Sequence, residues 1–146
     1  LRVDPTRYGD PVLQRADGGV NYNLAVVVDD IRDGVSEVVR GADLLDYTAV
    51  QMQLWRALGH RPPSWLHAPL ILGPDGKKLS KRGGADELNS GLAGANLVRG
   101  LRFLGLRPPV DLENAGIAEI WLWARDSWTI ETLRGVMERP EIGHLK

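Results

Sequence analysis

The feature that most constrains the fold is an apolar segment, Trp65–Leu72, that leads directly into a cationic loop, Gly73–Gly84. Apolar runs of this length that end in turn residues are typical of β-strands. The loop carries four basic residues and a hydroxyl between its flanking glycines: Lys77, Lys78, Ser80, Lys81 and Arg82. Because glycine adopts backbone angles that other residues avoid, the loop is expected to change conformation readily. The sequence therefore predicts a strand followed by a loop for an anionic group that arrives, reacts and leaves.

Further elements precede this strand. The continuous apolar run Leu24–Val28 predicts a strand covered on both faces, and Ser36–Leu45 predicts another short strand. Pro11–Arg15 is a further strand candidate, followed by a turn at Asp17-Gly18-Gly19. A helix is predicted from Thr48 to a stop at Gly59, with Thr48 and Gln51 as a capping box. Its apolar face consists of Val50, Leu54 and Leu58.

The chain becomes helical beyond Asp86. One predicted helix has its apolar face at Leu97, Val98, Leu101 and Leu104, with Gly105 as its stop. A second repeats apolar residues at helical spacing from Ile117 to Trp128. Strand, helix, strand and loop, followed by a small helical segment, predict an α/β fold. We expect two parts, residues 1–88 and residues 89–146.

Composition excludes several classes of protein. With 18 basic and 19 acidic residues the net charge is −1, so no overall basic surface indicates nucleic-acid binding, and only local patches such as the cationic loop could provide it. The chain has no cysteine, which excludes disulfides, thiolate zinc sites and a thiol nucleophile. Its three histidines show no metal-ligand spacing. The sequence shows no signal peptide and no apolar run long enough to span a bilayer, so we expect a cytoplasmic protein.

The cationic loop has two interpretations. On its own, such a run is most often a solvated surface loop or a basic targeting patch. Its position after a strand favours a ligand site, because open α/β sheets bind ligands at the carboxyl ends of their strands. Lysines and a serine suit a polyphosphate whose charge grows as a bond breaks, so the loop indicates phosphoryl or nucleotidyl transfer.

Three other positions could bind a ligand. Arg40 is either a surface ion-pair partner of Asp43 or a guanidinium fork that binds a carboxylate. Tyr22 is either an ordinary strand aromatic or a hydroxyl donor to the same ligand. The pair Asp29-Asp30 is more typical of a strand end that caps the next element than of a metal site.

The ordered motifs "YNLAVVVDD", "VVRGADLLD" and "HAPLILGPDGKKLSKR" resemble the second half of the catalytic domain of class I glutamyl-tRNA synthetases. "KLSKR" at Lys78–Arg82 is similar to the second signature of that class, KMSKS, with Leu79 for methionine and Arg82 for the final serine. The resemblance spans roughly Val12 to Gly105. Within the family, "RADGGVNYNLAVVVDD" and "RGADLLD" are most similar to the short bacterial branch, the glutamyl-queuosine tRNA(Asp) synthetases.

The resemblance implies a reaction and roles for residues. Members of the family join L-glutamate to ATP, with Mg²⁺ expected, and pass the glutamyl group of the adenylate to tRNA. In the similar branch the acceptor is the queuosine base of tRNA(Asp). Lys78 and Lys81 are implied as catalytic, and Lys81, Ser80 and Leu70 as ATP-binding. Tyr22 and Arg40 are implied to bind L-glutamate, and this segment is expected to hold neither zinc nor another metal.

Some family features are missing. The first signature, HIGH, the N-terminal glutamate-binding residues and the cysteine-rich zinc element all lie upstream in the family. The chain is therefore expected to be the C-terminal half of a longer ligase and to be inactive alone. Two alternatives remain open: a piece of an ordinary glutamyl-tRNA synthetase, or a non-catalytic interaction module that reuses this half-fold.

Overall fold

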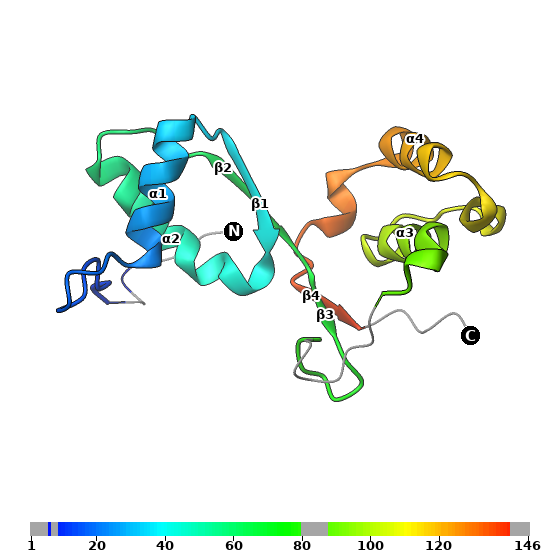
Figure 1. Cartoon of the computed structure of the whole chain (residues 1–146), viewed down its shortest axis with the longest axis horizontal. Coiled ribbons are helices and arrows are strands. Elements are labelled where there is room, and N and C mark those ends of the chain that lie inside the picture. Colours follow the sequence, from blue (N-terminus) through cyan, green and yellow to red (C-terminus); the bar gives the residue numbers. More distant parts are fainter. Residues whose placement is uncertain (1–5, 7–8, 80–87, 141–146) are drawn as a thin grey trace. The chain divides into compact units, whose positions relative to one another are not determined.

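The computed structural model describes residues 6, 9–79 and 88–140 (Figure 1). The chain divides into two compact units, Leu1–His67 and Ala68–Lys146, each with its own core. The expected boundary near residue 88 stays a prediction. Among the described residues, no helix has the length and apolar character needed to cross a membrane.

The first unit begins with a helix where a strand was expected. The run Leu24–Val28 lies inside α1 (Tyr22–Asp33), so its prediction as a buried strand is wrong. The side chain of Asn21 caps the helix by accepting from the backbone N–H of Asn23 at 2.8 Å. Gly34 ends it in the left-handed conformation, φ 70°, with its N–H directed to two carbonyls of the last turn. These two caps override the strand preference of the β-branched residues between them.

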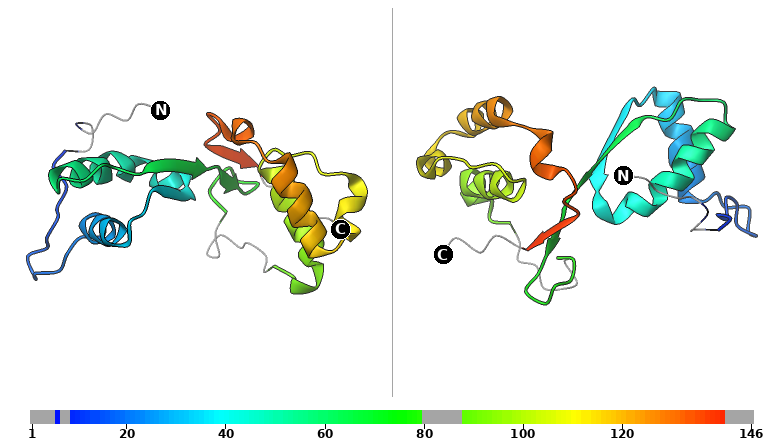
Figure 2. Two further views of the ribbon diagram at one scale, coloured as in Figure 1. Left: turned by 90° about the horizontal axis from the view of Figure 1, so that it is seen from above. Right: turned by 180° about the vertical axis from the view of Figure 1, so that it is seen from behind.

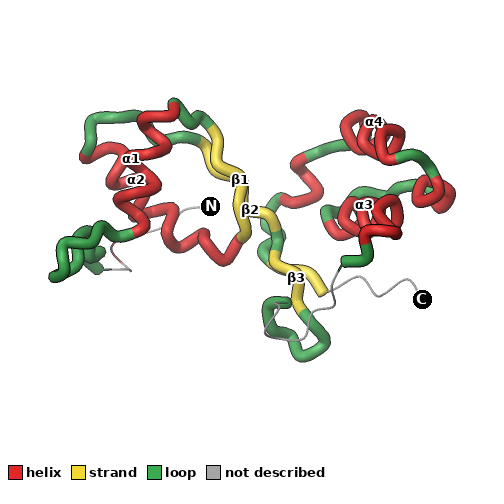
Figure 3. The backbone as a smooth tube through the Cα atoms, in the orientation of Figure 1, coloured by secondary structure: helices red, strands yellow, loops and turns green. Residues whose placement is uncertain are grey.

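The rest of the first unit is a strand, a helix and a second strand. β1 (Glu37–Gly41) confirms part of the expected strand, whose remainder is the 3₁₀ turn η2 (Ala42–Leu44). α2 (Leu45–Ala57) begins three residues before Thr48, so Thr48 is not its cap. The expected stop at Gly59 is confirmed, since Leu58 caps the helix and Gly59 has a φ of 80°. β2 (Ser64–Ala68) pairs with β1, and Figure 3 shows the two strands in yellow.

Packing of α1 against α2 forms the core of this unit, and Figure 2 shows the two helices from two further sides. Its buried residues are Val27, Val50, Leu54 and Trp55. Ahead of α1, the Asp17-Gly18-Gly19 turn is confirmed by a bond from Arg15 N–H to the Gly19 carbonyl at 2.8 Å. The strand expected at Pro11–Arg15 is wrong: only an isolated bridge between Gln14 and Val20 forms there.

The expected strand Trp65–Leu72 divides at Pro69. Proline has no N–H to donate to a ladder, so the chain changes partner at this point. β3 (Leu70–Leu72) pairs in parallel with β4 (Glu138–Pro140), which lies almost at the other end of the chain. The two expected C-terminal helices are confirmed as α3 (Ala93–Phe103) and α4 (Ile117–Ser127).

Three short 3₁₀ turns flank the helices of the second unit: η4 (Ser90–Leu92) precedes α3, η5 (Val110–Asn114) connects α3 to α4, and η6 (Ile130–Leu133) leads from α4 to β4. The core of this unit lies between α3, α4 and η5, and its buried residues are Val98, Leu101, Leu106, Leu112, Ile120 and Ala124. Gly105 ends α3 as expected, with a φ of 90°.

Candidate functional site

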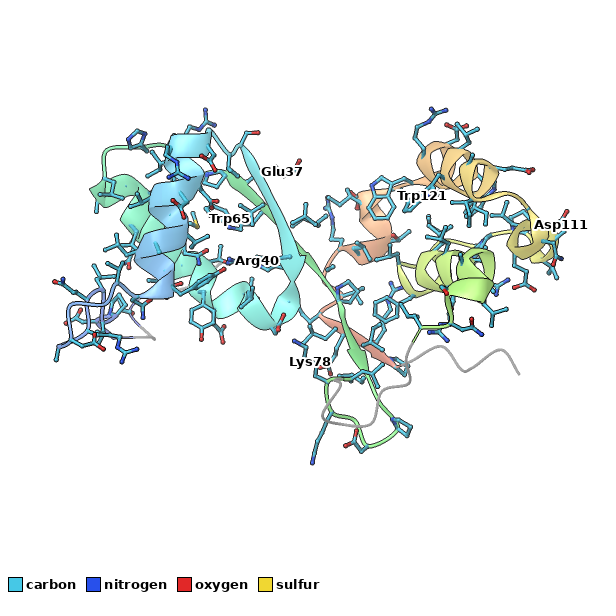
Figure 4. All side chains as sticks on the ribbon, viewed as in Figure 1. Glu37, Arg40, Trp65, Lys78, Asp111 and Trp121 are labelled. Carbon is cyan, nitrogen blue, oxygen red and sulfur yellow. The ribbon has the colours of Figure 1, made fainter. Side chains whose placement is uncertain are left out.

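Arg40 is the centre of the polar site in the first unit. Its side chain is half-buried, and Figure 4 labels it on β1. Nε donates to Nε2 of His67 at 3.3 Å and Nη1 donates to Oε1 of Gln51 at 2.8 Å. Nη2 donates to the Leu44 carbonyl at 3.0 Å and to Oγ1 of Thr48 at 2.8 Å. Four of the five guanidinium N–H groups therefore have acceptors within the described part of the chain, which leaves one N–H on Nη1.

Gln51 connects Arg40 to α1. Because a guanidinium only donates, the amide atom that faces it is the oxygen. The amide nitrogen of Gln51 then donates to Oδ1 of Asn23 at 3.0 Å. Both residues are buried, at 3% and 7% exposure, so these bonds are shielded from water. The position of the guanidinium therefore depends on both helices of the unit.

His67 and Thr48 complete the surroundings of Arg40. Oγ1 of Thr48 lies 3.1 Å from Nε2 of His67. Since Arg40 can only donate, Nε2 of His67 is an acceptor and its ring proton is on Nδ1. Burial lowers the pKa of His67, and the positive charge of Arg40 lowers it further, which favours this neutral ring.

The electrostatics of the site leave positive charge on Arg40 poorly solvated. Burial lowers the pKa of Arg40, while Tyr22, Asp30 and Asp43 act in the opposite direction. Asp43 thus acts as a nearby charge, but the hydrogen bonds of Arg40 go to other residues, so the surface-pair interpretation does not describe its position. Arginine keeps its proton under these conditions, so it cannot relieve the cost of burial by becoming neutral. The buried positive charge therefore favours binding of an anion.

Tyr22 lies at the first position of α1 rather than on a strand, and its side chain is 58% exposed. Tyr22 raises the pKa of the Arg40 guanidinium through space, so these two expected glutamate-binding residues lie in the same region of the first unit. Asp29 and Asp30 lie within α1, and their prediction as a strand end is wrong. Burial, followed by the charges of Asp29 and Asp33, raises the pKa of Asp30, while Arg40 lowers it.

The start of the cationic loop lies in the second unit. After β3 the chain turns through Pro74-Asp75 and returns at Lys78, which bridges to Leu72 in antiparallel register. The turn is closed by Gly73 N–H to the Lys77 carbonyl at 2.8 Å, with Gly76 left-handed at φ 72°. Lys78 is exposed on the returning segment, labelled in Figure 4. Leu70 starts β3 and donates its N–H to the Met137 carbonyl at 2.9 Å.

Other expected positions lie outside the described residues, namely Ser80, Lys81 and Arg82. Their implied roles stay predictions. Across residues 6, 9–79 and 88–140, no group of three or more His, Cys, Asp or Glu side chains could hold a metal ion.

Four polar residues around Arg40 were not predicted from the sequence: Asn23, Thr48, Gln51 and His67. A signal existed for two of them, because Thr48 and Gln51 are three residues apart and so share one face of a helix. They were interpreted as a capping box instead. Asn23 was missed because the segment after it was assigned to a strand, and His67 because the three histidines show no metal-ligand spacing and no other role was considered for them.

Comparison with known proteins identifies the family of the chain. Residues 1–114 match the model of the family described as tRNA synthetases class I (E and Q), catalytic domain. The chain is 49% identical over 120 residues to a glutamyl-Q tRNA(Asp) synthetase of Ectopseudomonas mendocina, covering 82% of this chain and 41% of that protein. It is 47% identical over 125 residues to the protein of the same name from Dechloromonas aromatica, covering 86% and 42%. The chain thus spans less than half the length of these relatives.

Comparison with solved structures identifies the same family. A glutamate tRNA ligase from Elizabethkingia meningosepticum, crystallised in complex with its amino acid, superposes with a TM-score of 0.60 at 26% identity. The match covers 90% of this chain and 30% of that one. The glutamate-tRNA synthetase of Elizabethkingia anophelis gives a TM-score of 0.61 at 25% identity, covering 89% and 30%. The expected α/β class I synthetase fold is thereby confirmed, and the chain belongs to the family of class I tRNA synthetases for glutamate and glutamine.

Proposed function

We propose that the full-length protein containing this chain is a ligase that activates L-glutamate with ATP and transfers the glutamyl group to the queuosine base of tRNA(Asp). The observation that carries the proposal is the half-buried guanidinium of Arg40, held by uncharged acceptors in a chain of this family. A guanidinium oriented in this way, with no carboxylate among its four hydrogen-bond acceptors, suits a substrate carboxylate.

Arg40 and Tyr22 would bind the glutamate. The one N–H of Nη1 that has no acceptor within the described residues is available to a carboxylate oxygen. A two-bond fork would require one of the present acceptors to move. The exposed hydroxyl of Tyr22 would give a second donor nearby. Together they would fix the amino acid, and the bonds to acceptors on η2, α2 and β2 would keep Arg40 from following the substrate.

The cationic loop would act on ATP. Lys78 and Lys81 would stabilise the charge that develops as pyrophosphate leaves, while Ser80 and Leu70 would contact the nucleotide. Mg²⁺ is expected with ATP, since phosphate oxygens are among its preferred ligands. The cytoplasmic location stays a prediction.

The choice of acceptor rests on the relatives. Those named glutamyl-Q tRNA(Asp) synthetase are 47% and 49% identical to this chain, whereas the two glutamate tRNA ligases are 25% and 26% identical. This difference favours the queuosine branch over an ordinary glutamyl-tRNA synthetase. Both groups of relatives are named as synthetases or ligases, which favours a ligase over a non-catalytic module.

Two assays of the full-length protein test the proposal. Glutamate-dependent exchange of pyrophosphate into ATP should occur without tRNA, and labelled glutamate should transfer to tRNA(Asp) that carries queuosine but not to tRNA(Asp) that lacks it. Charging of tRNA(Glu) instead would indicate the ordinary synthetase. If no pyrophosphate exchange occurred, either without tRNA or with any of these tRNAs, the result would contradict a ligase.

The variant Lys81→Ala addresses the loop. Removing a cation that acts on developing charge should lower kcat of the exchange reaction by about 100-fold with little change in glutamate affinity. An exchange rate equal to the wild type would remove Lys81 from the mechanism.

A further inference from the structure

The partners of Arg40 share a property that its proposed role does not require. Three of them are the side chains of His67, Thr48 and Gln51, and the fourth is the Leu44 carbonyl. We name these four groups the acceptor cage. None of the four acceptor atoms carries a charge once the imidazole is neutral. A half-buried arginine in proteins is more often paired with a carboxylate, which orients it and neutralises it together.

The geometry keeps the imidazole neutral. Nε2 of His67 receives the Nε proton of Arg40 and lies 3.1 Å from the Thr48 hydroxyl. The 3.3 Å distance to Arg40 is long for an N–H bond, as expected when two donors share one lone pair. A proton on Nε2 would remove this acceptor and bring a second cation against the guanidinium. The occupied lone pair therefore opposes protonation of His67.

The charged groups around the cage act on Arg40 through space and accept none of its hydrogen bonds. Arg40 is the charge that acts on His67 from β1, and α2 presents the neutral Thr48 and Gln51. Asp30 and Tyr22 of α1, together with Asp43 of η2, act on Arg40 through space. The hydrogen bonds that orient the guanidinium are thus separate from the carboxylate charges of Asp30 and Asp43 that attract it.

We propose that the acceptor cage is a charge-preserving positioning device, which fixes the guanidinium of Arg40 while leaving its positive charge for the substrate carboxylate. This inference rests on the proposed function, because it assigns a purpose to the surroundings of the glutamate-binding arginine. His67, Thr48 and Gln51 are positioning residues that act through Arg40. A partner of the same shape with a negative charge would hold Arg40 equally well and would compete with the substrate.

Gln51→Glu tests this idea with almost no change in shape. The carboxylate keeps an acceptor 2.8 Å from Nη1 but neutralises the guanidinium, and it can accept from the Asn23 amide once that amide turns to replace the bond that Gln51 donates now. In the full-length protein, the glutamate KM of pyrophosphate exchange should rise more than tenfold, while the melting temperature stays within a few degrees of the wild type. Gln53→Glu is the matched control, since Gln53 lies exposed on the same helix, and its KM should not change. A folded Gln51→Glu protein with the wild-type KM would overturn the proposal.

A second pair of variants keeps the test valid if Gln51→Glu unfolds the protein. His67→Gln offers Arg40 a neutral acceptor, and His67→Glu offers a charged one from the same position on β2. The glutamate KM of His67→Glu should exceed that of His67→Gln by more than tenfold. Equal KM values in two folded variants would contradict charge preservation. Absence of exchange in the wild type would instead contradict the proposed function, so the two failures can be told apart.

Discussion

Two half-buried arginines, one in each unit, are held in contrasting ways. Arg139 on β4 donates to the Phe103 carbonyl at 2.6 Å and to the Thr132 carbonyl at 2.8 Å. Both of its acceptors belong to the backbone. Arg40 on β1 donates to three side chains and one carbonyl. Backbone carbonyls are fixed by the fold, whereas side-chain acceptors can titrate, rotate or be exchanged by mutation.

The difference separates a structural arginine from a candidate substrate-binding one. Arg139 connects the end of α3 to η6 and β4. Its two acceptors are backbone carbonyls, which every residue type provides. The acceptors of Arg40 depend on the identities of Thr48, Gln51 and His67. We therefore expect substitutions at Arg139 to act on stability, and substitutions around Arg40 to act mainly on substrate affinity.

The largest effect on stability is expected for Arg139→Ala. Both carbonyls would lose a charged donor, and hydrogen bonds to charged groups contribute about 1.5–3 kcal/mol each. The free energy of unfolding of the full-length protein should fall by about 3 kcal/mol in urea titrations followed by tryptophan fluorescence. A loss below about 1 kcal/mol would show that the two bonds contribute little.

Gly105→Ala should destabilise the same region less. The new Cβ would lie 2.9 Å from Nη1 of Arg139 and 3.1 Å from Cβ of Thr132, at a backbone φ of 90° that favours glycine. Because the arginine end is flexible and can shift, we expect a loss of about 2 kcal/mol. Gly100→Ala is the control, since an added Cβ there meets no atom within 4 Å. Equal unfolding free energies for the two variants would contradict close packing around Arg139.

Thr48→Val should have a smaller effect on stability. Valine keeps the shape of threonine but removes the hydroxyl that accepts from Arg40 and contacts Nε2 of His67. Loss of one hydrogen bond typically costs about 1 kcal/mol. We expect the glutamate KM to rise at the same time, because the guanidinium loses one side of its support. An unchanged KM with reduced stability would assign Thr48 to the fold alone.

The smallest effect concerns pH. Burial and Arg40 lower the pKa of His67 in the folded state, so the unfolded state binds more protons below the ordinary histidine pKa of about 6.5. The stability contributed by neutral His67 is full above that value and is lost as the pH falls through the folded pKa. His67→Gln should therefore reduce the difference in unfolding free energy between pH 7 and pH 5. His60→Gln, at an exposed position, is the control. A pH dependence unchanged by His67→Gln would contradict the neutral imidazole.

Sequence alone predicted the second unit better than the first. α3 and α4 follow a regular apolar spacing with glycine or proline nearby, so local pattern was sufficient for them. Leu24–Val28 failed because β-branched residues prefer strands in isolation, and the caps at Asn21 and Gly34 decided the outcome. The division at Pro69 depends on pairing with β4, which is far away in sequence, and no local pattern contains that pairing.

The candidate site was predicted only in part. Arg40 and Tyr22 were predicted from motifs and lie in the same region of the first unit, and their roles stay predictions. The acceptor cage was missed because it combines Leu44 of η2 and two residues of α2 with His67 of β2, which lies 19 residues after Thr48. Thr48 and Gln51 lie on one face of a helix, and interpreting them in this way instead of as a cap would have indicated two of its four acceptors.

The account is tested most directly by the glutamate KM of pyrophosphate exchange in full-length protein carrying either Arg40→Lys or Arg139→Lys. Lysine keeps the charge at both positions but loses the planar set of donors. Disrupting a partly buried charged contact typically costs about 2–5 kcal/mol, so Arg40→Lys should raise the KM well over tenfold. Arg139→Lys should leave the KM unchanged and lower only the stability. A KM unaffected by Arg40→Lys, or raised equally by both substitutions, would contradict the distinction between the two arginines.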